Sequence, residues 1–497
     1  MTFLRQLPLL LLLFAAPADA ALRAGAARVD ITDREAGPVA EASYVKALAI
    51  EDGATRAVIV TVDAVAIGGI GRIDDGYLGR VRGAVERELG IPAKHILVNA
   101  SHCHSVIRRD VDALTIEAVR QAWRALTPVR AGAGRGMEDR IQENRRMKLR
   151  DGRETDVRRA YAMPRDEDVV STGPIDPEIG LLRLDRVDTG APLAVVYLFA
   201  AHPIQGAPDN GNTADYPAFA SRAIEENLGA GVLAFFVQGC AGDINPARYK
   251  NVHEPHDAEP LGNRLGLSAL RGLRAIRTTE GATLRVVNET LALPRSSDTA
   301  ARMAKLRARR EELLKSLQGT TLNFKTFVTL YLEHQLSGGM PAYYAHGYLH
   351  EKDRGRQDLR TLDEENRAAI QAYLRNVETM EELTRLQTNL ALIEQHHAEA
   401  LKLPPTLEVE VAGLRIGDFR LVLFPGELTV QIGLNIKQRA PGPFTFVAGY
   451  SNGYIFYTPT AEQRRNPGYA QEDCDTLVAP EWQGLFEAKA LAVLGRL

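Results

Sequence analysis

The chain has 497 residues, of which 45% are hydrophobic and 25% are charged, so it can bury one large core or a few smaller ones. This composition is typical of a globular protein and excludes a disordered chain. The formal net charge is −3 and the charges are interspersed. Because nucleic-acid binding requires a basic surface, we expect no nucleic-acid partner.

The first twenty residues have the pattern of a secretory signal peptide. Arg5 precedes an apolar block over 7–16, and Ala18-Asp19-Ala20 fits an A-x-A cleavage signal. The block is well short of the ~20 residues that a spanning helix needs, and no later segment is long and apolar enough. We therefore expect a secreted or periplasmic protein that begins near Ala21 and has no transmembrane segment.

Short β-rich runs alternate with helical patterns from about residue 23 to residue 293. Strand-like runs cover 56–67, 95–100, 193–202 and 232–239, and helical patterns include 78–89 and 217–227. Buried strands interleaved with amphipathic helices predict an α/β fold, with a layered mixed β-sheet flanked by helices.

The composition changes between residues 296 and 404. The stretches 301–317 and 366–403 are long, charged and periodic, with few glycines or prolines. They predict a long helical insertion, either a hairpin or a small bundle. Strand character returns over 406–427, where Gly417-Asp418 predicts a hairpin turn. The main domain would then consist of residues 21–295 and 405–497, preceded by a signal peptide over 1–20.

The segment NASHCHS, residues 99–105, directly follows an apolar run. In extended backbone, side chains two residues apart point to the same face, so His102 and His104 could converge on one point. His-x-His at a strand end is a common metal-ligand arrangement, although a polar loop has the same pattern. Alternation would turn Cys103 away, so we interpret it as a small buried residue, with a nucleophile or ligand as the weaker alternative.

Polar residues follow other apolar runs in the same way. His202 does so, as do the segment 238–243 and Glu427. In α/β sheets the loops at the carboxyl ends of strands meet, so these residues predict one site assembled from distant parts of the chain. The three cysteines, Cys103, Cys240 and Cys474, permit one disulfide that the sequence cannot assign.

Six segments occur in the order and context of the neutral ceramidase family, zinc amidases that cleave the N-acyl bond of ceramide. They are NASHCHS, ENRR, AAHPI, QGCAGDINP, FPGE and GYSNGYIFYTPT, and the opening AGAARVDIT and Asp63 of VTVDA also fit. The sequence resembles the catalytic domain of this family from about Leu22 to Leu497, interrupted by the helical insertion. The two parts of the main domain would therefore be the two parts of that catalytic domain.

The resemblance implies a Zn²⁺ site. Its ligands would be His102, His202, Glu427 and Tyr457, with Tyr454 as the competitor of Tyr457. Two neutral imidazoles, a carboxylate and a phenolate suit Zn²⁺, and room for a water would leave the open position that a catalytic metal requires.

The resemblance also implies catalytic residues around the metal. It places His104 and Arg145 near the substrate carbonyl and Tyr469 as a further donor. Fixed donors would stabilise the oxyanion, and His104 could pass a proton to the leaving amine. Asp243 and Asp215 would either orient a metal-bound histidine or cap loops.

The sequence departs from the family at three places. Asn245 stands where ceramidases have a serine, and it can bind a substrate hydroxyl or amide but cannot act as a nucleophile. Val106-Ile107 replaces a Gly-Pro turn. The chain ends soon after the tyrosine segment, so we expect it to lack the β-sandwich domain that ceramidases append. The acyl chain and the amine head of the substrate therefore stay open.

We predict an exported zinc-dependent amidohydrolase that cleaves a ceramide-like lipid or a related N-acyl amide by metal-activated water. Its partner would be a small-molecule or lipid substrate, and the resemblance leaves room for peripheral contact with membrane lipid. Two alternatives stay open: a noncatalytic member of the family that binds a lipid or glycan, and a hydrolase of other esters, such as phosphate or sulfate esters.

Overall fold

The structure is a computed structural model that describes residues 21–53, 55–157, 164–251, 253–337 and 345–497. The predicted signal peptide therefore lies outside the described residues. Within them, no helix combines the length and the apolar character that crossing a bilayer requires. Cys103, Cys240 and Cys474 are buried, and among the described residues no disulfide joins any two of them.

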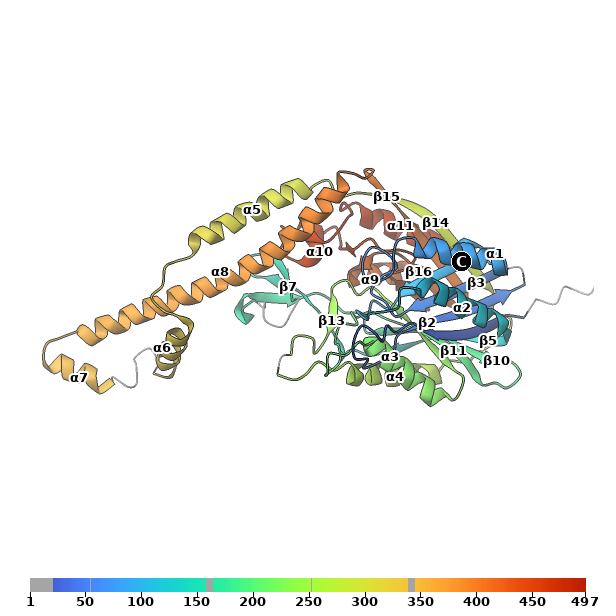
Figure 1. The fold of residues 1–497 in the computed structure, drawn as a ribbon, viewed down its shortest axis with the longest axis horizontal. Coiled ribbons are helices and arrows are strands. Elements are labelled where there is room, and N and C mark those ends of the chain that lie inside the picture. Colours follow the sequence, from blue (N-terminus) through green and yellow to red (C-terminus); the bar gives the residue numbers. More distant parts are fainter. Residues whose placement is uncertain (1–20, 54, 158–163, 252, 338–344) are drawn as a thin grey trace, which may run out of the picture.

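A large mixed sheet, made of eight strands in the described part of the chain, runs in the order β12-β11-β10-β5-β1-β2-β3-β4 (Figure 1). Most neighbours are antiparallel, but β3 pairs with β4 and β11 with β12 in parallel. The strands are β1 (Arg23–Asp30), β2 (Tyr44–Asp52), β3 (Thr55–Val62), β4 (Ile96–Ala100), β5 (Thr127–Met137), β10 (Glu178–Arg186), β11 (Pro192–Phe199) and β12 (Leu233–Gln238).

A second sheet runs in the order β14-β15-β16-β18. Its strands are β14 (Leu284–Pro294), β15 (Thr406–Ile416), β16 (Phe419–Leu423) and β18 (Thr445–Ala448). β15 and β16 form the predicted hairpin, and Gly417 closes it with a φ of 57°, a left-handed conformation that glycine adopts without steric cost. β16 and β18 are parallel.

The two sheets pack face to face, and helices cover both outer surfaces. On β2, Leu48 and Ile50 belong to the core shared with the second sheet, whereas Ala47 and Ala49 face the helices, as alternation along a strand requires. The helices α1 (Tyr77–Leu89), α2 (Val111–Arg124), α3 (Asp215–Leu228) and α4 (Glu259–Arg274) cover the large sheet; α9 (Val430–Arg439) and α11 (Trp482–Arg496) cover the second. The predicted layered α/β fold is confirmed.

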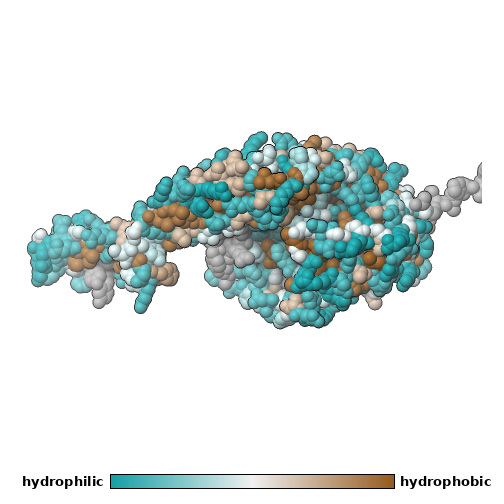
Figure 2. All heavy atoms as spheres, turned by 45° about the horizontal axis from the view of Figure 1, so that its top comes forward, coloured by the Kyte–Doolittle hydropathy of each residue, from teal (hydrophilic) through white to brown (hydrophobic). Residues whose placement is uncertain are grey.

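Helices fill the described part of the segment between the two strands β14 and β15. They are α5 (Thr299–Ser316), α6 (Phe324–Leu336), α7 (Ala345–Asp353) and α8 (Asp358–Ala400). They extend from the layered body as an arm (Figure 1), whose surface is mostly hydrophilic with scattered hydrophobic patches (Figure 2). At ~1.5 Å per residue, α8 alone is about 65 Å long. The division into domains at residues 295 and 405 stays a prediction.

The base of the arm packs on the body. One apolar cluster joins α8, through Leu386, Leu390 and Ile393, to Tyr469 and Cys474. Tyr469 precedes the short helix α10 (Gln471–Cys474), and Cys474 is its last residue. The arm is therefore in contact with the segment that follows the predicted zinc-binding tyrosines.

The aromatic core beneath the second sheet should dominate the stability of the body. Trp482 is fully buried, stacks on Phe424 and Phe486 at 5.7 and 5.8 Å, and donates its ring N–H to the Pro459 carbonyl at 2.8 Å. We expect Trp482→Ala to lower the free energy of unfolding by about 3–5 kcal/mol, measured by urea denaturation. Leu485→Ala, at a 43% exposed position of the same helix, should cost less than ~1 kcal/mol. If both substitutions lowered the free energy of unfolding equally, the buried aromatic core would not be the main source of this stability.

Candidate metal centre

Three strand ends bring His102, His202 and Glu427 together. His102 follows β4, His202 follows β11, and Glu427 begins β17 (Glu427–Leu428), just beyond β16. All three residues are 2% exposed, and one ligand atom of each lies within 4.8 Å of the others. The prediction that strand-end residues from distant parts of the chain meet is therefore confirmed for these three, and the cluster could hold a metal ion.

The hydrogen bonds of the two imidazoles determine which nitrogen faces the cluster. The Nδ1 atom of His102 lies 2.6 Å from the Val65 carbonyl oxygen, and that of His202 lies 3.0 Å from the Ile244 carbonyl oxygen. Because a carbonyl can only accept, each Nδ1 carries the proton, and each Nε2 of a neutral ring is left with a lone pair. These Nε2 atoms lie 3.5 and 3.2 Å from the Oε2 atom of Glu427.

Burial keeps both imidazoles neutral. Desolvation lowers the pKa of His102 to about 4, against the opposing effect of Glu427, and it also lowers the pKa of His202. Burial alone would raise the pKa of Glu427, but the hydrogen bonds that Tyr454 and Tyr450 donate to its two oxygens favour the ionised carboxylate. Two imidazole lone pairs and a carboxylate therefore face one another in a dry site. Such an arrangement is electrostatically favourable when a cation lies between them.

The backbone at this centre is not extended. His102 has a φ of 66°, and Tyr450, Asn452 and Phe456 have φ values of 53°, 58° and 60°. The expectation that His102 and His104 share the face of an extended strand is therefore wrong, because the chain leaves β4 after Ala100 and turns so that the His102 N–H bonds to the Ala64 carbonyl at 2.9 Å. The two rings are still neighbours, with centroids 5.4 Å apart. Left-handed residues of this kind gather at functional sites.

Glu427 and Tyr457 are placed by direct strand pairing. β17 pairs in parallel with β19 (Tyr457–Thr458), and Glu427 lies opposite Tyr457 in the register. Tyr454 donates its hydroxyl hydrogen to Oε1 of Glu427, and Tyr450 donates to Oε2 at 3.2 Å. The contact of Tyr450 with Glu427 was not predicted from the sequence, although Tyr450 lies in the GYSNGYIFYTPT segment that resembles the family.

Arg145 lies beside Tyr457 and is 5% exposed. Its guanidinium carbon is 5.3 Å from the centre of the Tyr457 ring, and the guanidinium hydrogen-bonds the side chain of Tyr457. Its other partners are the Glu472 carboxylate, the Gly242 carbonyl and the Asn245 amide oxygen, at 2.8, 2.8 and 3.3 Å. The guanidinium is therefore engaged by the protein on several sides.

The other residues predicted to be catalytic occupy three different environments. His104 is exposed beside His102. Asn245 is 1% exposed, accepts from Arg145 and donates to the Val157 carbonyl at 3.1 Å. Tyr469 packs against the base of the arm, with the Arg153 guanidinium 4.2 Å from its ring centre. Among the described residues, Tyr469 contacts the arm, Cys474 and Arg153, whereas His102, His202 and Glu427 form a separate cluster.

Asp243 and Asp215 cap loops. Asp243 accepts from the Val430 N–H at the start of α9 at 2.8 Å, and Asp215 accepts from the N–H groups of Gly206 and Tyr216 at 2.6 and 2.8 Å. The backbone carbonyls of Val65 and Ile244, and not these aspartates, orient the rings of His102 and His202.

Cys103 is also a structural residue in this arrangement. Its sulfur lies 3.3 Å from the Ser101 hydroxyl and 3.4 Å from that of Ser105. Burial raises the pKa of this thiol to about 12, so it stays protonated at neutral pH, which disfavours a role as nucleophile or metal ligand.

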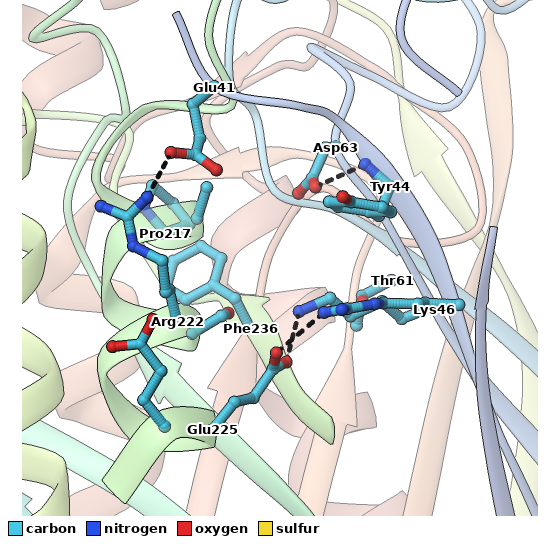
Figure 3. A pocket seen from close by; sticks show the side chains of 13 residues that line it. Glu41, Tyr44, Lys46, Thr61, Asp63, Pro217, Arg222, Glu225 and Phe236 are labelled. Atoms are coloured by element: carbon cyan, nitrogen blue, oxygen red, sulfur yellow. Dashed lines mark hydrogen bonds and ion pairs between the residues drawn. The ribbon is translucent and has the colours of Figure 1, made fainter. Parts of the chain in front are cut away.

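A separate cavity of about 280 Å³ lies between α3 and strands β1–β3 (Figure 3). Its charged walls are largely paired: Glu225 binds both Lys46 and Arg28, and Glu41 binds Arg222. Asp63 faces the cavity and accepts from the Tyr44 N–H at 2.9 Å; burial raises its pKa to about 6. No member of the His102, His202 and Glu427 cluster is among the described residues that line this cavity.

The fold has known counterparts among solved structures. The crystal structure of neutral ceramidase from Pseudomonas aeruginosa matches with a TM-score of 0.59 and 16% identity, over 97% of this chain and 75% of that chain. A ceramidase complexed with C2 matches with a TM-score of 0.59 and 15% identity, over 96% of this chain and 76% of that chain. No protein-family model matches the sequence, and no curated protein matches it. The chain therefore has a neutral-ceramidase-like α/β fold, and at this identity the likeness extends to the fold alone.

Asp215 should make stability depend on pH. Its carboxyl is buried, and desolvation raises its pKa to about 7, well above the value of 3.8 of a free carboxyl. Ionisation therefore favours the unfolded chain, so the contribution of Asp215 to stability is present at acidic pH and is lost as the pH rises from about 4 through about 7. We expect the urea midpoint of the wild type to fall relative to that of Asp215→Asn between pH 5 and pH 8. A constant difference between the two proteins would contradict the shifted pKa.

Proposed function

We propose that the protein is a zinc-dependent amidohydrolase that cleaves the N-acyl amide bond of a ceramide-like lipid or a related N-acyl amide. The observation that carries this proposal is the buried cluster of His102, His202 and Glu427, with imidazole lone pairs facing a carboxylate, on a fold shared with neutral ceramidase. The motifs that resemble the ceramidase family supply the reaction type.

The donor set fits Zn²⁺. Imidazole nitrogen and carboxylate oxygen are borderline and hard ligands that zinc accepts, and catalytic zinc sites combine a few protein ligands with an open position. When bound at such a site, zinc activates water for attack on a carbonyl near neutral pH.

Tyr457 is the best candidate for a fourth ligand. Tyr450 and Tyr454 both use their hydroxyl hydrogens on Glu427, whereas Tyr457 interacts with Arg145. A guanidinium only donates, so the phenolic oxygen of Tyr457 accepts. Burial and Glu427 raise the pKa of Tyr457, and Arg145 opposes them. A dication in the site would add to the effect of Arg145 and favour the phenolate.

His104 is suited to proton transfer. It is exposed beside the buried His102, where a substrate could reach it. Desolvation and His102 lower the pKa of His104 to about 4, so its free ring is neutral near pH 7 and would accept a proton before it passes one to a leaving amine. Arg145 would support the oxyanion through its positive charge and through Tyr457, since its N–H groups already have protein partners.

Export, by a signal peptide over residues 1–20, and peripheral contact with membrane lipid are parts of the same proposal. A ceramide-like substrate resides in lipid, so an exported enzyme of this kind would meet it at a membrane surface.

Metal content and activity test the proposal together. We expect about one zinc per chain by elemental mass spectrometry, and hydrolysis of an N-acyl sphingoid amide that stops on chelation and returns with zinc. His102→Ala and Glu427→Ala should each lose the metal and at least ~10³-fold in kcat/KM, because each removes a ligand. His253→Ala, at an exposed histidine, is the control and should retain both.

Other outcomes identify the alternatives. A protein that binds the lipid with or without metal and never hydrolyses it would be a binding protein. Cleavage of phosphate, sulfate or other esters in place of amides would reassign the reaction. A metal that survives both alanine substitutions would show that the cluster is not the metal site.

The tyrosines can be separated by metal affinity. We expect Tyr457→Phe to weaken zinc binding by more than ~10-fold, because it deletes a ligand atom. Tyr454→Phe should weaken binding less, because it deletes a hydrogen bond to Glu427 and leaves every ligand in place. Competition with a chromophoric chelator measures both constants. The reverse order would assign the ligand to Tyr454.

A further inference from the structure

A fully buried carboxylate lies behind Arg145. Glu472 is in the short helix α10 and is 0% exposed. Its Oε1 atom accepts from Nε of Arg145 at 2.8 Å and lies 2.7 Å from Nη2, and its Oε2 atom accepts from Nη1 of Arg146 at 3.2 Å. One carboxylate thus binds the guanidinium groups of two consecutive arginines.

We propose that Glu472 is a positioning residue for the proposed amidase reaction: it sets the orientation of the Arg145 guanidinium against Tyr457. This inference rests on the proposed function for its catalytic consequence and on geometry for the orientation itself. Nothing in the sequence motifs pointed to Glu472, because it lies 327 positions from Arg145 along the chain.

The contacts of the guanidinium support this role. A guanidinium is planar, so a partner on the edge formed by Nε and Nη2 fixes the direction of the opposite edge. Glu472 occupies the first edge, and Nη1 of Arg145 bonds to Asn245. The plane held in this way places the guanidinium carbon 5.3 Å from the centre of the Tyr457 ring.

Glu472 is itself prevented from moving. Arg146, which binds its second oxygen, is also bonded to Asp473 at 2.9 Å, to Glu154 and to the Gln463 carbonyl at 3.3 Å. The two arginines therefore share a network with three carboxylates, of which Glu472 and Asp473 are buried, and a swing of Glu472 would break several charge-assisted hydrogen bonds.

The arm holds the segment that carries Glu472. Asn389 of α8 donates to the Gly468 carbonyl at 2.8 Å, and His396 lies 2.6 Å from the Asp475 carboxylate. The Asp475 carbonyl in turn accepts from the Tyr457 N–H at 3.0 Å. The base of the arm thus fixes residues 468–475, which contact Arg145 through Glu472 and Tyr457 through Asp475.

Three variants separate orientation from charge and from folding. Glu472→Gln keeps the shape and removes the charge, and Glu472→Asp keeps the charge and shortens the reach. Asp473→Asn is the matched control, because Asp473 is 1% exposed in the same helix and pairs with Arg146 and not with Arg145. Without the Asp473 charge, Arg146 still has Glu472, Glu154 and the Gln463 carbonyl as partners, so Glu472 stays held. Each purified variant is measured for zinc content, kcat and KM on an N-acyl sphingoid amide, and its crystal structure is determined.

We expect Glu472→Gln and Glu472→Asp to lower kcat by about 10–100-fold, with KM within about threefold and zinc content unchanged, because small displacements of a catalytic group are costly. Asp473→Asn should keep kcat within about threefold. In an Arg145→Lys background, Glu472→Gln should have little further effect. If Glu472→Asp matched the wild type, or if Asp473→Asn lost as much as Glu472→Gln, the role would be general charge balance and the proposal would be overturned.

The crystal structures decide the orientation even if the wild type does not hydrolyse amides. In that case the proposed function fails, while a guanidinium that leaves the Tyr457 ring in Glu472→Gln and stays in Asp473→Asn would still support positioning by Glu472. A guanidinium that remains about 5.3 Å from the ring in Glu472→Gln would overturn the inference, whatever the activity.

Discussion

The arrangement on which the rest of this structure depends is the approach of two neutral imidazoles to one buried carboxylate. The Nε2 atoms of His102 and His202 lie 3.5 and 3.2 Å from the same oxygen of Glu427, in a site from which water is largely excluded. Without a cation, lone pairs face lone pairs at low dielectric, which is unfavourable. Carbonyl acceptors at each Nδ1 atom and tyrosine donors on Glu427 hold this geometry. Neither kind of partner occupies the Nε2 lone pairs, so these lone pairs and the carboxylate remain available to a cation.

The layered body explains how residues so far apart in sequence reach one point. Parallel pairing of β3 with β4, of β11 with β12 and of β16 with β18 directs several strand ends toward the same edge of the fold. Asn99 ties these ends together: its amide donates to the Gly449 carbonyl and to the Ser451 hydroxyl, and its oxygen accepts from the Gln238 N–H, each at 2.9 Å. Rigid strands thus position a site whose own backbone is irregular.

Around this centre the charges form successive shells. The Arg145 guanidinium lies over the Tyr457 ring, and Glu472 accepts hydrogen bonds from Arg145 and from Arg146. Arg146 in turn donates to Asp473. The helical arm packs against the outermost of these layers at residues 468–475. The arm therefore contributes to the surroundings of the centre through its base, independently of any role of its distal helices.

The sequence by itself predicted several strands and the long helices α5 and α8, because periodic apolar residues and long charged stretches are local signals; it did not predict the helices α6 and α7. It also determined the chemical identity of the cluster, since His102, His202 and Glu427 each follow an apolar run and lie in segments that resemble one family. Only the tertiary structure decided the left-handed turn at His102, the separate surroundings of Tyr469, and the partnership of Arg145 with Glu472. These features depend on contacts between residues from 37 to 327 positions apart, so no local pattern could encode them.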